Sequence, residues 1–242
     1  MNFDTTQTVR EVALNIPGAT RVLEKFGIDY CCGGQKSLEQ ACGDAHLNLE
    51  QVIESLGTAV ASDRSRQGGN PWQSGALADL ISHIKNTHHK YTREEISRLG
   101  PLFDKVSNVH GAKHPELLEM RHDFWALAQE LTNHMAKEEM VLFPYIERME
   151  EAIIAGDPIL PAPFGSVENP VAKMIHEHDE AGKLLRSLRQ RSHDYQAPEG
   201  ACVSYKTLFS ALDEFEKDLH QHIHLENNVL FPRAIDMEGR QG

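Results

Sequence analysis

The sequence has 242 residues, of which 40% are hydrophobic, and this is enough for one large domain or for a small and a medium-sized one. Its formal net charge of -12 argues against nucleic acids and anionic membranes as main partners, since both attract clustered Lys and Arg. The N-terminus has no basic segment followed by an apolar one, and no run approaches the roughly 18 apolar residues of a membrane helix. We therefore expect a cytoplasmic protein without a membrane partner.

Residues 1–60 predict a small helical domain. Two stripes of apolar residues at helical spacing come first. After a Cys-Cys-Gly-Gly loop, Ser37 with Gln40 and Asn48 with Gln51 have the spacing of two capping boxes, so two further helices are expected.

A linker is predicted for residues 61–73. This stretch contains Ser-Asp-Arg-Ser-Arg-Gln-Gly-Gly-Asn-Pro, which has no apolar period and several helix breakers. Residues 74–242 would then form a second domain.

The second domain is predicted to be an antiparallel four-helix bundle. No segment alternates with period two, so the whole chain is expected to be all-α. Gly- and Pro-containing stretches separate four long amphipathic segments, which is typical of a bundle. These helix candidates are 74–106, 115–152, 167–193 and 203–238.

An eleven-residue pattern occurs twice in the second domain, and it indicates a metal site. His134 and Glu138 in the first copy correspond to His222 and Glu226 in the second, 88 residues further on. Residues four apart lie on one face of a helix, so each copy presents an imidazole beside a carboxylate. The Val-Leu-Phe-Pro that ends both copies is interpreted as core residues followed by a helix-bending Pro.

Two further imidazoles are expected on the other two helices. His178 follows the apolar stripe of its helix, whereas His176 lies off it. In the first helix, periodicity favours His88 slightly over His89. The separation of 89 residues between His89 and His178 favours His89, because it nearly equals the spacing of the repeat.

Four imidazoles and two carboxylates in a bundle core suit two iron ions that share two bridging Glu and a bridging oxygen from solvent. Imidazole tolerates several metals, whereas bridging carboxylates favour Fe or Mn. Open coordination positions would accept a diatomic such as O2 or NO. The alternative is that the histidines are hydrogen-bonded core residues, but two carboxylates buried without a cation would cost several kcal/mol each.

The bundle resembles haemerythrin-like domains, and nearly the whole chain resembles the bacterial repair of iron centres (RIC) di-iron proteins. Their short ScdA-type N-terminal domain carries the Asp-Tyr-Cys-Cys-Gly-Gly motif, present here at Asp29–Gly34. His176-Glu-His-Asp-Glu-Ala-Gly182 is a second shared block. The resemblance implies two non-haem iron ions per chain, bridged by oxygen and by the two Glu. It assigns the metal ligands to His89, His134, Glu138, His178, His222 and Glu226.

The resemblance also implies a function: repair of iron-sulfur clusters damaged by nitrosative and oxidative stress, with iron donated from a labile site. Such a protein is a repair factor rather than a conventional enzyme, and damaged iron-sulfur proteins are its partners. The alternatives are a redox enzyme that reduces nitric oxide or peroxide, a haemerythrin-like protein that binds O2 or NO, and a metal-free interaction bundle. The linker length allows the N-terminal domain to dock on its own chain or in a homodimer.

Two further pairs of residues are candidates for handling iron. Cys31 and Cys32 cannot form an unstrained disulfide with each other, because adjacent Cα atoms are only about 3.8 Å apart. They are candidate iron-transfer thiols, and one packed Cys beside a bystander is the alternative. Glu130 and Glu177 match positions near the di-iron site in relatives, so they are candidates for an iron path or else ordinary surface carboxylates.

Overall fold

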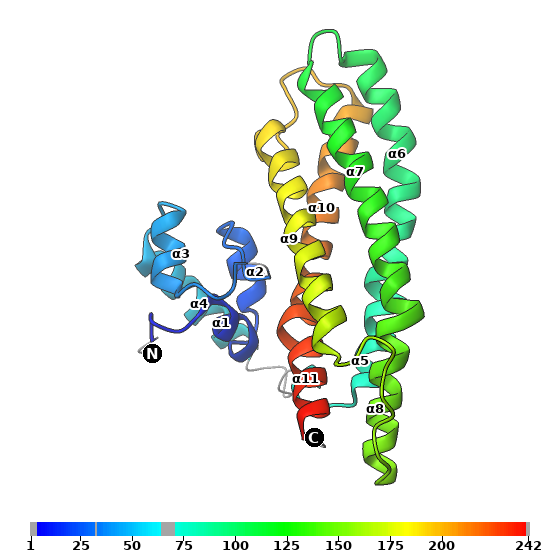
Figure 1. Ribbon diagram of the computed structural model, residues 1–242. Coiled ribbons are helices and arrows are strands. Elements are labelled where there is room, and N and C mark those ends of the chain that lie inside the picture. Colours follow the sequence, from blue (N-terminus) through cyan, green and yellow to red (C-terminus); the bar gives the residue numbers. More distant parts are fainter. Residues whose placement is uncertain (1–3, 32, 64–70, 241–242) are drawn as a thin grey trace. The chain divides into compact units, whose positions relative to one another are not determined.

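The computed structural model describes residues 4–31, 33–63 and 71–240, and its regular elements in these ranges are helices (Figure 1). Pairing of extended backbone is limited there to isolated bridges, Thr8 with Ser37 and Ala162 with Gly165. Contacts between residues divide the chain into two compact units. The first joins Met1–Ala76 with His220–Arg233, and the second joins Leu77–Leu219 with Ala234–Gly242.

The N-terminal part of the first unit has four helices, as the sequence predicts. They are α1 (Val9–Asn15), α2 (Ala19–Lys25), α3 (Leu38–Asp44) and α4 (Leu49–Asp63), followed by the 3-10 turn η1 (Pro71–Gln73). Their apolar stripes meet in one small core that includes Val9, Val12, Leu23, Leu38, Val52 and Leu56.

Side-chain caps begin α3 and α4. Ser37 Oγ accepts a hydrogen bond from the Gln40 N–H at 3.1 Å, and Gln40 Oε1 accepts from the Ser37 N–H at 3.3 Å, which confirms the predicted capping box. Asn48 Oδ1 accepts from the Gln51 N–H at 3.3 Å. Such caps satisfy backbone donors that the first helical turn leaves open.

The predicted linker lies only partly in the described residues. Helix α4 continues to Asp63, so the first residues of that stretch are helical, and η1 occupies its end. Residues 64–70 lie outside the described ranges, as does Cys32. The predicted domain limits, 1–60 and 74–242, stay a prediction.

The remaining helices form the predicted bundle. Four long helical segments, here called rods, run side by side and alternate in direction in Figure 1. Their longest helices are α6, α7, α9 and α10. The ends of the rods agree with the four predicted helices to within a few residues. The elements are α5 (Leu77–His83), η2 (Ile84–His89) and α6 (Lys90–His110); α7 (Glu116–Lys137), η3 (Glu138–Leu142) and α8 (Phe143–Ala155); α9 (Glu168–Arg191); and α10 (Val203–Leu225), η4 (Glu226–Leu230) and α11 (Phe231–Gly239).

Three of the four rods contain a π-helical turn that the sequence did not predict. η2 ends at His89, η3 begins at Glu138 and η4 begins at Glu226. π-Helical turns are rare, and they occur frequently at functional sites. Each of these three turns therefore marks a residue of the predicted metal site.

One predicted core position is wrong. In the Val-Leu-Phe-Pro of the first copy, Leu142 and Phe143 are buried, but Val141 is 49% exposed because it lies on the solvent side of η3. Its counterpart Val229 is 2% exposed.

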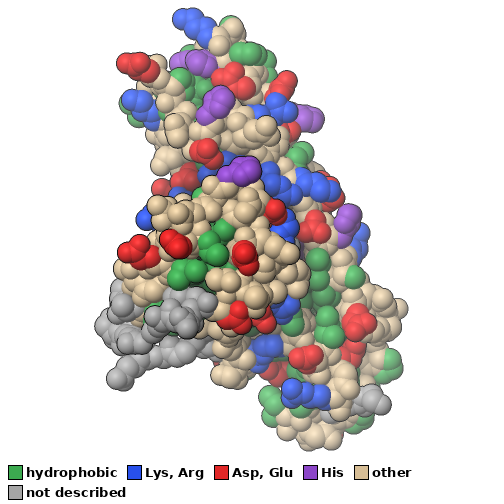
Figure 2. Space-filling view, turned by 90° about the vertical axis from the view of Figure 1, so that its left-hand side faces the viewer, with side chains coloured by type: hydrophobic (Ala, Val, Ile, Leu, Met, Phe, Trp, Pro, Cys, Tyr) green, Lys and Arg blue, Asp and Glu red, His purple; other side chains and the backbone are tan. Residues whose placement is uncertain are grey.

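The surface carries many charged side chains, as expected from a sequence with 25% charged residues. Acidic and basic side chains are interspersed over the face drawn in Figure 2. None of the helices in the described part of the chain combines the length and apolar character that a bilayer crossing requires.

Candidate metal centre

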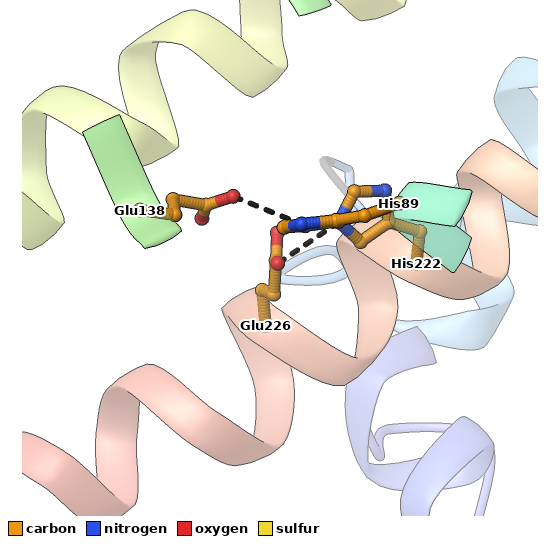
Figure 3. Close-up of side chains that lie close together, drawn as sticks. All are labelled: His89, Glu138, His222 and Glu226. Carbon is orange, nitrogen blue, oxygen red and sulfur yellow. Dashed lines mark hydrogen bonds and ion pairs between the residues drawn. The ribbon is translucent and has the colours of Figure 1, made fainter. Parts of the chain in front are cut away.

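The structure brings all six predicted ligands together. Each is at most 2% exposed. They form two overlapping groups, in each of which one ligand atom per residue lies within 4.8 Å of the others. One group is His89, Glu138, His222 and Glu226, drawn in Figure 3, and the other is His134, Glu138, His178 and Glu226. Both carboxylates belong to both groups.

Short distances between inward-facing atoms define this centre. Glu138 Oε2 lies 3.4 Å from His89 Nε2 and 3.3 Å from His134 Nε2. The Nε2 atoms of His134 and His178 are 2.9 Å apart. Glu226 Oε1 lies 2.9 Å from His222 Nε2, and Figure 3 shows these two side chains next to each other. The imidazoles therefore turn their Nε2 atoms toward the carboxylates.

The outer nitrogen of His89 is held by a further carboxylate. His89 Nδ1 lies 2.7 Å from Glu139 Oε1, and Glu139 Oε2 lies 3.0 Å from an Arg93 guanidinium nitrogen. Burial opposes the ionisation of Glu139, but the hydrogen bonds from His89 and Arg93 outweigh it and lower the pKa of Glu139. An ionised carboxylate can only accept, so Nδ1 carries the proton and the Nε2 lone pair faces the centre.

His134 is held in the same way. Its Nδ1 donates to Glu177 Oε2 at 3.1 Å, and Lys137 Nζ donates to Glu177 Oε1 at 2.5 Å. Lys173 Nζ is 3.4 Å from the same oxygen. Burial opposes the ionisation of Glu177, but the hydrogen bonds from Lys137 and His134 outweigh it and lower the pKa of Glu177. Glu177, predicted as part of an iron path, thus contacts a predicted ligand directly.

The other predicted residues join neither group. His88 is 4% exposed, but its Nδ1 lies 3.0 Å from Asp218 Oδ1, so the geometry selects His89. Glu130 is exposed on α7. Cys31 is buried, its sulfur lies 3.3 Å from Asp29 Oδ1, and its carbonyl accepts from Asn227 Nδ2 at 3.3 Å within the first unit.

Sequence reasoning did not assign a role to Glu139 and Arg93. The Arg93 side chain is 46% exposed, so by its exposure it resembles an ordinary surface residue. The available signal was the doubled Glu138-Glu139 of the first copy, where the second copy has Glu226-Asn227.

The donor set fits iron. Two carboxylates without exposed surface, among four buried imidazoles, would be costly without a compensating cation. The six residues offer nitrogen and oxygen but no thiolate, which disfavours a structural zinc and suits a non-haem iron site. The buried His/Glu groups are thus compatible with iron binding.

Comparison with known proteins identifies both parts of the chain. The family model Hemerythrin, described as the Hemerythrin HHE cation binding domain, matches residues 80–234. The ScdA_N model, a domain of unknown function (DUF542), matches residues 5–60. The iron-sulfur cluster repair protein YtfE of Pectobacterium carotovorum is 35% identical over 229 residues, which cover 95% of this chain and 96% of that protein.

The protein of the same name from Yersinia pseudotuberculosis is 34% identical, again over 95% of this chain and 96% of its own length. The similarity therefore spans the N-terminal domain and the bundle together. The chain belongs to the family of iron-sulfur cluster repair proteins that combine an ScdA_N domain with a haemerythrin domain.

Proposed function

We propose that this protein repairs iron-sulfur clusters damaged by nitrosative and oxidative stress by donating iron from a non-haem di-iron site. The observation that carries the proposal is the pair of buried His/Glu groups that share both carboxylates. The relatives are named iron-sulfur cluster repair proteins, and this supports the proposed repair function. Damaged iron-sulfur proteins are the proposed partners, and the cytoplasm is the proposed location.

The proposed ligands divide between two ions. His89 and His222 would hold one iron, His134 and His178 the other, and Glu138 with Glu226 would bridge the two. Two imidazoles and two shared carboxylates leave each iron with positions that no protein ligand fills. Bound iron would supply redox chemistry and a binding place for nitric oxide or O2, and it is also the cargo of the repair reaction.

The protein's own residues shape how the cargo is held. The Glu138 and Glu226 side chains have no exposed surface, and Glu139 and Glu177 hold two imidazoles in the tautomer that offers Nε2 to a metal. Cys31 and Cys32 are proposed to pass iron to the acceptor. The domain limits 1–60 and 74–242 belong to the same proposal, and the family matches to residues 5–60 and 80–234 support them.

Isotope transfer tests iron donation. The protein would be loaded with ⁵⁷Fe and incubated anaerobically with a [4Fe-4S] dehydratase that nitric oxide has inactivated, and the dehydratase would then be re-isolated. We expect dehydratase activity to recover and ⁵⁷Fe to appear in the Mössbauer spectrum of its cluster. A Cys31→Ser, Cys32→Ser double variant should keep its iron and transfer it more slowly.

The outcomes separate the proposal from its rival. Recovery without ⁵⁷Fe in the cluster would contradict donation and favour a redox enzyme that removes nitric oxide. A purified protein that binds no iron would contradict the di-iron site itself.

A further inference from the structure

Two successive carboxylates on η3 hold the same imidazole from opposite sides. Glu138 Oε2 lies 3.4 Å from His89 Nε2, and Glu139 Oε1 lies 2.7 Å from His89 Nδ1. In a regular α-helix, neighbouring side chains point about 100° apart. They converge on one ring here in a π-helical turn, whose wider backbone differs from that of the flanking helices.

The contacts continue outward from the ring to the surface. The Glu138 side chain is fully buried, that of Glu139 is 25% exposed, and that of Arg93 is 46% exposed. Arg93 follows His89 by four residues, so both lie on one face of the same rod. Its guanidinium is therefore placed to hold Glu139 against the ring and to offset the charge that Glu139 adds.

We propose that Glu139, held by Arg93, is a positioning residue that sets how tightly the centre retains iron through His89. A carboxylate that accepts from Nδ1 fixes the tautomer and the orientation of the ring and makes Nε2 a stronger ligand. The inference rests on the proposed di-iron site and adds a determinant of iron release that the six ligands do not contain.

The test measures iron release. Parent and variant proteins would be loaded with Fe(II), mixed anaerobically with a coloured ferrous chelator, and followed by stopped-flow absorbance. Glu139→Gln keeps the size of the side chain but removes its charge, and we expect release to become about 10- to 100-fold faster, the usual effect of losing an outer-sphere partner. Arg93→Gln leaves the Glu139 carboxylate in place and should give a smaller acceleration.

The matched control is Glu94→Gln. Glu94 lies on the same helix as Arg93, its side chain is 64% exposed, and it is 3.9 Å from Lys90 Nζ. This variant makes the same change of charge without touching the ring, so we expect parental release. The Mössbauer quadrupole splitting should change in Glu139→Gln and stay parental in Glu94→Gln, a readout that a loss of stability alone would not produce.

Parental release from Glu139→Gln, or equal acceleration by Glu94→Gln, would overturn the inference. If Glu139→Gln does not fold, Arg93→Gln decides, and parental release from that variant would overturn it as well. A parent protein without iron would instead contradict the proposed di-iron site.

Discussion

The two copies of the repeat, residues 134–144 and 222–232, are alike on the side that faces the predicted metal site and different on the side that faces away from it. We call these the inner side and the outer side. In both copies the His and Glu are buried, a π-helical turn begins at the Glu, and the following Leu and Phe are buried. Outward, Met140 is 78% exposed, whereas its counterpart Asn228 is 7% exposed. The predicted metal site requires the residues of the inner side. The exposure of the outer side depends on which residues pack against each copy.

Within the first unit, the outer side of the second copy is engaged by N-terminal residues. Asn228 Nδ2 donates to the Tyr30 carbonyl at 3.0 Å and lies 2.9 Å from His224 Nδ1. Burial, followed by the positive charge of Arg10, lowers the pKa of His224 to about 4, so the ring is neutral at pH 7 and its Nδ1 can accept. In the first copy, Glu139 instead reaches Arg93 and solvent.

The largest expected effect tests the likeness of the inner sides. Each copy gives its His to a different group, and both Glu belong to both groups. His134→Ala and His222→Ala should therefore each reduce the iron content from about two to about one per chain, whereas Glu138→Ala or Glu226→Ala should lose most of both ions. Metal analysis and Mössbauer spectra provide the measurement. Full iron in a His134→Ala protein, or unequal losses from the two Glu variants, would break the equivalence of the copies.

A smaller effect tests the difference between the outer sides. Val229→Ala removes two buried methyl groups and should lower the free energy of unfolding by about 1–3 kcal/mol. The matched change Val141→Ala, at a 49% exposed side chain, should stay within about 0.5 kcal/mol of the parent. Urea unfolding of both variants gives the comparison. Equal losses would mean that the outer side of the first copy is covered in solution.

The smallest expected effect concerns α1, whose Arg10 guanidinium donates to the Asn228 carbonyl at 3.3 Å. Thr8 caps this helix, and hydrogen bonds from its backbone N–H and then its hydroxyl to the Glu11 carboxylate lower the pKa of Glu11. A lowered pKa in the folded state gives stability that is present above the unfolded pKa and is lost as the pH falls through the folded pKa. Glu11→Gln should therefore be slightly less stable than the parent at neutral pH.

This difference should vanish once Glu11 is protonated in the folded parent. Urea titrations of both proteins from neutral to acidic pH follow it. A difference that persists in acid, or that grows there, would show that the cap acts through something other than the charge of Glu11.

Much of the fold and of the predicted metal site could be predicted from the sequence, because the apolar residues and the His/Glu pattern both recur at regular spacing. Apolar residues at helical spacing predicted the four rods, and the repeat named the His and Glu that the structure brings together. Capping residues such as Ser37 and Gln40 act on their own backbone, so local sequence was sufficient for them.

Tertiary structure decided what periodicity could not. His88 and His89 are both buried, and only the positions of Asp218 and Glu138 on other rods show which ring faces the centre. Glu139 reaches His89 from a π-helical turn, and α-helical spacing does not predict that it contacts the same ring as Glu138. The sequence by itself determined the His and Glu that the two copies contribute to the predicted centre, because that pair repeats along one helix face. Their orientation depended on packing between helices, because it is set by residues far apart in the chain.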